Sequence, residues 1–193
     1  LYDMLSNWSI SLFGDSNVAL RLPSIVGVWV ACLSAYFFLR PRTGPAPAWC
    51  GVAVLLASDA SRYATEARPY ALVLGVTGIL LLAWQAAAAG IQRRWTLPLT
   101  ALCVFLLGSV HYLAVLLLLP FAVAEVFRCL RMRRIDYSMM AAFAAGAAAL
   151  LIYLPLLFEI RAFASVFWSR PSLLGAVLMA QGSMSSPFLL AAV

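Results

Sequence analysis

The chain has 193 residues, of which 65% are hydrophobic and 10% are charged, and its formal net charge is +6. A soluble domain of this size is about half apolar and a quarter charged, so this composition excludes an ordinary water-soluble fold. The basic residues are all arginines and most of them flank apolar runs, which favours membrane topology over nucleic-acid binding as the reason for the charge. We expect no nucleic-acid partner.

The continuous apolar runs predict a polytopic α-helical membrane protein. A bilayer core about 30 Å thick is crossed by roughly 20 helical residues, so the chain has room for about six spans or partial spans. An outer-membrane barrel would show alternating apolar and polar residues instead. We therefore expect an all-α transmembrane bundle that forms a single membrane domain over residues 1–193, with amphipathic interfacial helices. We also expect this domain to be an internal fragment of a longer chain.

The first half of the chain predicts an interfacial segment, a span, a partial span and a second full span. Residues 1–22 form an interfacial helix and loop, because apolar residues recur there at helical spacing. The first clear span is 23–39, and the apolar run at 49–58 is so short that it reaches only part way across the membrane. After a polar stretch at 59–68, Pro69 begins a long span, because proline in the first helical turn costs no hydrogen bond.

The second half predicts a hairpin and a further span. Residues 95–127 are long enough to cross twice, and basic clusters flank them on both sides, so we expect a turn near residues 108–111. A span at 137–157 follows, and transmembrane helices therefore extend over 23–158. The remainder divides into an extracytoplasmic loop and the start of another span: residues 159–186 and 187–193.

The arginines are divided unequally between the two predicted sides of the membrane. Eight lie on one side and five on the other, and the positive-inside rule places the eight in the cytoplasm. Five of the seven acidic residues lie on the other side, which is typical of a polar working surface. We expect a multi-pass membrane protein whose polar surface of mixed charge lies outside the cytoplasm. The eight are Arg40, Arg42, Arg93, Arg94, Arg128, Arg131, Arg133 and Arg134.

The densest polar cluster ends at the predicted helix start at Pro69. An arginine fork beside a helix N-terminus suits a phosphate or pyrophosphate, because Arg68 and the helix dipole stabilise the same anion. Glu66 can orient Arg68 or accept hydrogen bonds from sugar hydroxyls. The alternative is that Glu66 and Arg68 only pair with each other at the lipid headgroups. The candidate binding residues of this segment are Asp59, Arg62, Glu66, Arg68 and Tyr70.

His111 is the single histidine, and the predicted hairpin places it on the same outer side as Glu66 and Arg68. This convergence makes it a candidate binding residue, with a hydrogen-bonded structural histidine at a helix turn as the alternative. The sequence contains no metal-ligand cluster, nucleotide-binding glycine loop or catalytic serine elbow. We therefore predict no metal and no cofactor.

Three stretches together resemble a known group of enzymes. They are Gly14–Ser24 (GDSNVALRLPS), Glu66–Leu72 (EARPYAL) and His111–Tyr112 in an apolar hairpin. Their order and spacing resemble the bacterial branch of the protein O-mannosyltransferase-like membrane glycosyltransferases (glycosyltransferase family 39). This GT-C fold group includes the lipid A aminoarabinose transferases. The resemblance covers most of residues 1–160.

The resemblance implies an inverting glycosyltransferase that passes a sugar from a polyprenyl-phosphate donor to a lipid, glycan or protein acceptor outside the cytoplasm. In such a family an aspartate deprotonates the acceptor hydroxyl, the hydroxyl attacks the anomeric carbon, and the lipid phosphate leaves. Arg68 would then stabilise the leaving phosphate, and Glu66 and Tyr70 would position Arg68 or the sugar. His111 would donate a hydrogen bond to the phosphate or to the sugar.

The family's catalytic acidic motif lies upstream of the region that corresponds to Leu1, so the catalytic base is unknown within this chain. Asp15 is an acid of the same loop, but its place in the Gly-Asp-Ser stretch predicts a helix N-cap. A transporter or flippase of lipid-linked sugars is the alternative function, because polar groups at interrupted helices also form transport sites. A non-catalytic membrane scaffold is a third possibility.

Overall fold

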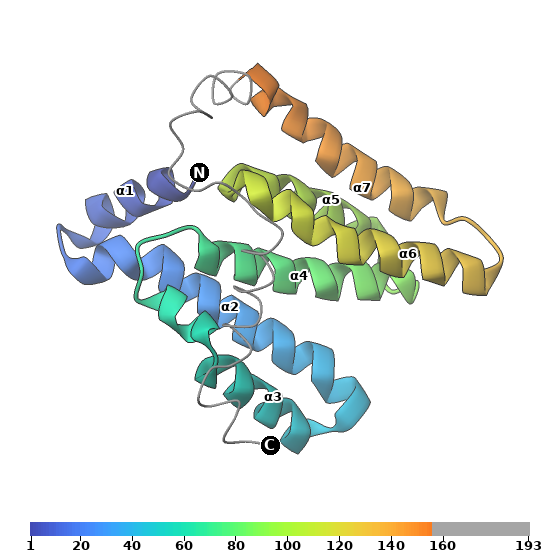
Figure 1. Cartoon of the computed structure of the whole chain (residues 1–193), viewed down its shortest axis with the longest axis horizontal. Helices are drawn as coiled ribbons and strands as arrows, with labels where there is room; N and C mark the ends of the chain where they lie inside the picture. The colour runs from blue at the N-terminus through green and yellow to red at the C-terminus, as the bar shows by residue number, and fades with distance from the viewer. Residues whose placement is uncertain (156–193) are drawn as a thin grey trace, which may run out of the picture.

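A computed structural model describes residues 1–155 as a bundle of helices joined by short turns (Figure 1). This part of the chain contains no strand. The expected segments 159–186 and 187–193 lie outside the described residues. The α-helices are α1 (Tyr2–Phe13), α2 (Asn17–Thr43), α3 (Pro45–Ala57), α4 (Tyr70–Ala88), α5 (Arg93–Val110), α6 (Leu118–Met132) and α7 (Tyr137–Ala149). The short 3₁₀ helices are η1 (Asp59–Ala64), η2 (Tyr112–Leu117) and η3 (Leu150–Tyr153).

Three helical segments are long and apolar enough to cross a membrane: Asn17–Thr43, Tyr70–Ala88 and Leu113–Met132. The apolar segments Pro45–Ala57 and Tyr137–Tyr153 are helical but shorter. The all-α prediction is therefore confirmed for the described residues, and a membrane bundle fits them. Six spans or partial spans, and their orientation in the membrane, remain predictions.

Helix α2 begins six residues before the expected start of the first span at Pro23. The cause is Ser16, whose Oγ accepts a hydrogen bond from the backbone N of Ala19 at 3.1 Å and caps the helix. The prediction that Asp15 is the N-cap was wrong by one residue. Gly14 has φ 81°, a left-handed conformation that favours glycine, and it lets α1 turn sharply into α2.

Helices α2 and α4 are in close contact because glycines face each other across the interface. A Cβ placed on Gly75 would lie 2.7 Å from the carbonyl oxygen of Gly27, and a Cβ on Gly27 would lie 2.7 Å from the backbone N of Leu72. Ala31 and Ser34 are also buried on α2, so small residues line this helix at helical spacing. Such small-residue contacts are how membrane helices approach closely.

The main apolar core lies where α4, α5 and α6 meet. Leu80, Val104, Leu107 and Phe121 are buried in it. Helix α7 joins at Gly146, where a Cβ would lie 2.7 Å from the Cβ of Val104 on α5. The small residue at this position therefore lets α7 pack closely against α5.

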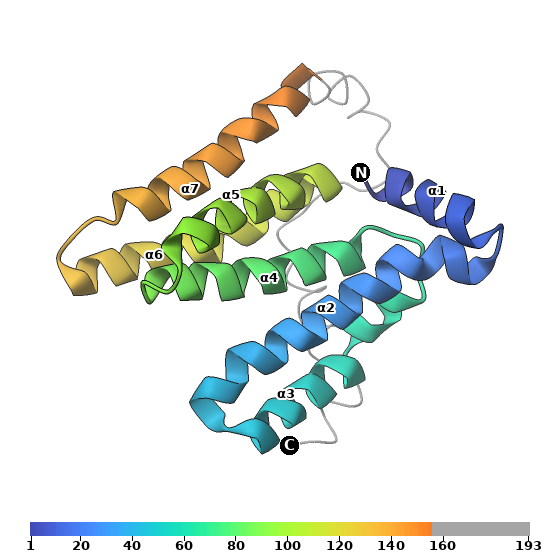
Figure 2. The same ribbon diagram turned by 180° about the vertical axis from the view of Figure 1, so that it is seen from behind.

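The predicted hairpin is confirmed: α5 and α6 run in opposite directions and turn at His111. The ends of α2, α4 and α6 lie on the same side of the bundle as the starts of α5 and α7 (Figures 1 and 2). This side carries the eight arginines assigned to the cytoplasm. The opposite side carries the turn at His111 and the start of α4, and we call it the outer end.

Candidate functional site

At the outer end, an aromatic row links the polar segment before α4 to the hairpin turn. The rings of Tyr63 on η1 and Tyr70 at the start of α4 have centroids 5.3 Å apart. The rings of Tyr70 and His111 are 5.5 Å apart. The predicted convergence of His111 with the Glu66–Tyr70 segment is therefore confirmed. Tyr63 lies within the polar cluster of the sequence, but we did not predict it as a site residue.

His111 also shapes the turn between α5 and η2. Its backbone N–H donates to the carbonyl of Leu107 at 3.1 Å, which ends α5. Its Nδ1 accepts a hydrogen bond from the backbone N of Leu113 at 3.3 Å. A neutral imidazole with an accepting Nδ1 carries its proton on Nε2. His111 thus has the structural role of the alternative interpretation, and its imidazole also lies against Tyr70.

The backbone of Arg68 is fixed by the first two helices. The Oγ of Ser24 on α2 donates to the carbonyl oxygen of Arg68 at 3.2 Å. The same Oγ lies 3.0 Å from the hydroxyl of Tyr2 on α1, and Ser24 is fully buried. Ser24 closes the first of the three sequence stretches and Arg68 lies in the second, so these stretches are in direct contact. No local pattern indicates this contact, because 44 residues separate the partners.

The charged side chains of this end form two exposed ion pairs. Arg68 Nε lies 3.7 Å from Glu66 Oε2, and Arg62 Nη1 lies 3.4 Å from Asp59 Oδ1. The first pair matches the alternative in which Glu66 and Arg68 pair with each other. Among residues 1–155, Asp59 and Arg62 form no ion pair with Glu66 or Arg68, so the predicted six-residue set divides into separate groups.

Each of these exposed ion pairs costs little free energy to break. The Arg68 side chain is 66% exposed, and exposed pairs contribute only about 0–1 kcal/mol to stability. A phosphate could replace the Glu66 carboxylate on this guanidinium with shorter, bidentate geometry. No side chain caps the N-terminus of α4, which follows Arg68 by two residues.

A second charged cluster, at the arginine-rich end, was not predicted. Asp136, before α7, accepts hydrogen bonds from Arg93 Nη2 and Arg128 Nη2, each at 2.7 Å. Arg128 also pairs with Glu125 one turn earlier on α6, and Trp84 Nε1 on α4 donates to Glu125 at 3.0 Å. The cluster therefore joins side chains of α4, α5, α6 and the start of α7.

This second cluster balances two guanidinium groups with two carboxylates, and each charge has a partner. Hydrogen bonding to Arg93 and then to Arg128 holds the pKa of Asp136 well below its usual range. We assign the cluster a structural role, as a clamp between helices. One feature of the sequence could have indicated this cluster. Glu125 is an ionisable residue in an otherwise apolar run, and such residues in membrane proteins almost always pair with another polar or charged group.

No metal site forms within the described part of the chain, where no three histidine, cysteine or acidic side chains come together. Comparison with known protein families, with curated proteins and with solved structures found no match for this chain.

Proposed function

We propose that this chain is part of an inverting membrane glycosyltransferase of the GT-C type, and that the outer end binds its polyprenyl-phosphate sugar donor. One observation carries the proposal. The three sequence stretches that resemble the family are in contact: Ser24 bonds to Arg68, and Tyr70 lies against His111. These contacts bring a guanidinium group, tyrosine rings and an imidazole from the matching stretches to one end of the bundle, and such a combination of groups supports a shared binding site.

The chemistry of the cluster fits a phosphosugar. The Arg68 guanidinium offers a charge-assisted fork to a phosphate oxygen, and the aromatic faces of Tyr63 and Tyr70 offer apolar contact to a sugar ring. An imidazole such as that of His111 has the donor chemistry that a phosphate or hydroxyl oxygen accepts. Glu66 would hold Arg68 in the absence of donor and accept a sugar hydroxyl in its presence.

In this proposal the enzyme acts at the extracytoplasmic face of a bacterial inner membrane. The donor enters from the bilayer, and a lipid, glycan or protein accepts the sugar. Arg68 stabilises the negative charge that develops on the leaving lipid phosphate, which is the electrostatic part of the catalysis. A general base takes the proton of the acceptor hydroxyl as this oxygen attacks the anomeric carbon and the lipid phosphate leaves.

The test is transfer of radiolabelled sugar from polyprenyl-phosphate donors by the full-length protein. Loss of a hydrogen bond to a charged group costs about 1.5–3 kcal/mol, so Arg68→Ala should reduce transfer about 10- to 150-fold. Arg68→Lys keeps the charge without the fork and should recover only part of the activity. Arg40→Ala removes the same charge at the arginine-rich end and is the matched control.

Two results would overturn the proposal. One is equal transfer by the Arg68→Ala and Arg40→Ala variants at equal folded protein. The other is a wild-type protein that transfers no sugar but moves lipid-linked sugar between leaflets, which would favour the transporter alternative.

A further inference from the structure

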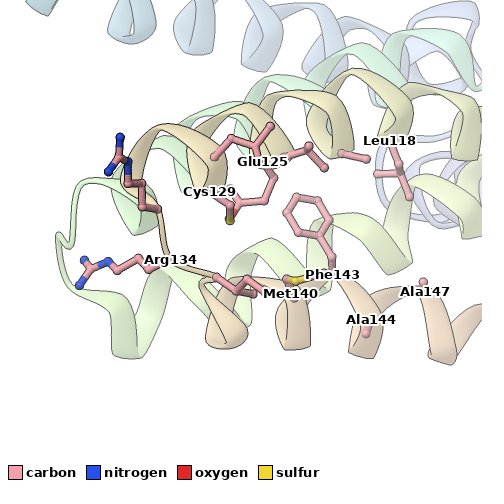
Figure 3. Close-up of a pocket in the computed structure, with 13 residues that line it drawn as sticks. Leu118, Glu125, Cys129, Arg134, Met140, Phe143, Ala144 and Ala147 are labelled. Carbon is pink, nitrogen blue, oxygen red and sulfur yellow. The ribbon is translucent and has the colours of Figure 1, made fainter.

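An apolar groove lies between α6 and α7 (Figure 3). Its volume is about 810 Å³, within the range of small-molecule and lipid-sized ligand sites. None of the six predicted donor-binding residues lines it. Its apolar walls include Leu118, Ala122 and Val126 on α6 and Phe143, Ala144 and Ala147 on α7.

The groove has a cationic end. Arg133 and Arg134 line it where α6 ends, and Arg134 lies at the opposite end of the groove from Leu118 and Ala147 in Figure 3. Within residues 1–155, neither arginine forms an ion pair. The charge of Glu125, which also lines the groove, is already matched by Arg128. The groove therefore combines a long apolar wall with two guanidinium groups that have no acidic partner in this part of the chain.

The groove is longer than the hydrocarbon of one leaflet is deep. From Leu118 to Arg133 an α-helix rises about 22 Å, while the hydrocarbon of one leaflet is about 15 Å deep. A lipid tail can thus lie along the apolar wall while its phosphate reaches the level of Arg133 and Arg134.

The candidate occupants of the groove differ in how well their charge matches its cationic end. A second copy of this chain seated across the groove would bring its own Arg133 and Arg134 close to these two arginines, and like charges repel. An apolar helix or a zwitterionic lipid would leave the two guanidinium groups without a net negative partner. An anionic phospholipid matches both the apolar wall and the cationic end, and basic pockets between membrane helices bind such headgroups.

We propose that the groove between α6 and α7 binds an anionic phospholipid, with its phosphate on Arg133 and Arg134 and one acyl chain between Val126 and Ala144. This site is independent of the proposed sugar-donor site. Arg133 and Arg134 lie at the end that carries the eight arginines, so the bound phosphate belongs to the leaflet on that side.

The test measures binding of dioleoyl-phosphatidylglycerol to the full-length protein in detergent by native mass spectrometry. Dioleoyl-phosphatidylcholine has the same chains without net charge and should bind at least tenfold more weakly. The double variant Arg133→Gln/Arg134→Gln should bind phosphatidylglycerol about 30-fold more weakly, from about 1 kcal/mol for each arginine near the headgroup. Its control is Arg40→Gln/Arg42→Gln, which removes two charges at the same end but outside the groove.

A second pair of variants tests the apolar wall without changing charge. Ala144→Phe fills the groove and should weaken phosphatidylglycerol binding, while Ala148→Phe adds the same volume at an exposed position of α7 that does not line it. Circular dichroism checks that each variant folds.

Equal effects of the two double arginine variants would overturn the proposal, because the charge would then act without a site. Equal effects of the two phenylalanine variants would place the lipid elsewhere. Disulfide cross-linking between copies that carry Ala144→Cys would show that a second chain occupies the groove instead.

Discussion

The contact between α2 and α4 predicts that one methyl group at Gly27 destabilises the fold. A Cβ there would lie 2.7 Å from the backbone N of Leu72 and closer still to the backbone of Ala71, whereas ordinary contacts begin at 3.4 Å. The obstacles are main-chain atoms, which cannot rotate away as a side chain can. The helices must therefore separate by at least about 0.7 Å at this point.

The magnitude follows from two opposing terms. A gap of 0.5–1 Å loses a quarter to a half of the dispersion energy of the affected contacts, and overpacking of this kind costs about 1–3 kcal/mol. Replacing a helical glycine by alanine recovers about 1 kcal/mol of helix propensity. Gly27→Ala should thus lower the free energy of unfolding by about 1 kcal/mol.

Gly51→Ala is the matched control, because it makes the same chemical change in another helix. Its Cβ would meet the Cδ1 end of the Leu39 side chain, which can change rotamer. This variant should keep the propensity gain of about 1 kcal/mol, so the two variants should differ by about 2 kcal/mol. For a protein of this size the difference corresponds to about 4–8 °C in Tm.

The assay is thermal unfolding of the detergent-solubilised protein, followed by circular dichroism at 222 nm. Gly75→Ala widens the same interface from the α4 side, so its effect and that of Gly27→Ala should be less than additive. A Gly27→Ala protein as stable as Gly51→Ala would refute the close approach of α2 and α4.

Three further predictions concern the charged clamp and the start of α2. Asp136→Ala leaves Arg93 and Arg128 without their shared carboxylate and should cost about 3 kcal/mol in urea unfolding, and a loss below 1 kcal/mol would exclude a clamp. The pKa of Asp136 is lower in the folded chain than its usual value near 3.9, so its stabilising effect is complete above about pH 5 and is lost as pH falls further. The Tm of the wild type should accordingly fall more steeply than that of Asp136→Asn between pH 5 and 3, and parallel curves would contradict this. Ser16→Ala removes the cap on Ala19 and should cost about 1 kcal/mol by thermal unfolding, whereas Ser16→Asp should retain most of the stability.

Some features of the outer end could be predicted from local sequence. Apolar runs bounded by arginines predicted the α5–α6 hairpin, and the hairpin in turn predicted that His111 comes near the Glu66–Tyr70 segment. Pro69 marked the start of α4 to within one residue. These inferences succeed because each depends on a local feature of the sequence: the length of an apolar run, the charges that flank it, or the position of a proline.

The sequence by itself therefore determined the helical class, the apolar segments and the polar residues that flank each segment. Tertiary structure alone decided which faces meet, such as Gly27 against Gly75 and Ser24 against Arg68. Helix α4 is apolar around its whole circumference, so no periodicity indicates which side packs against protein and which faces lipid. The same holds for Glu125 and Asp136, whose partners on α4 and α5 lie more than 40 residues away and are selected by the rotation of each helix about its own axis.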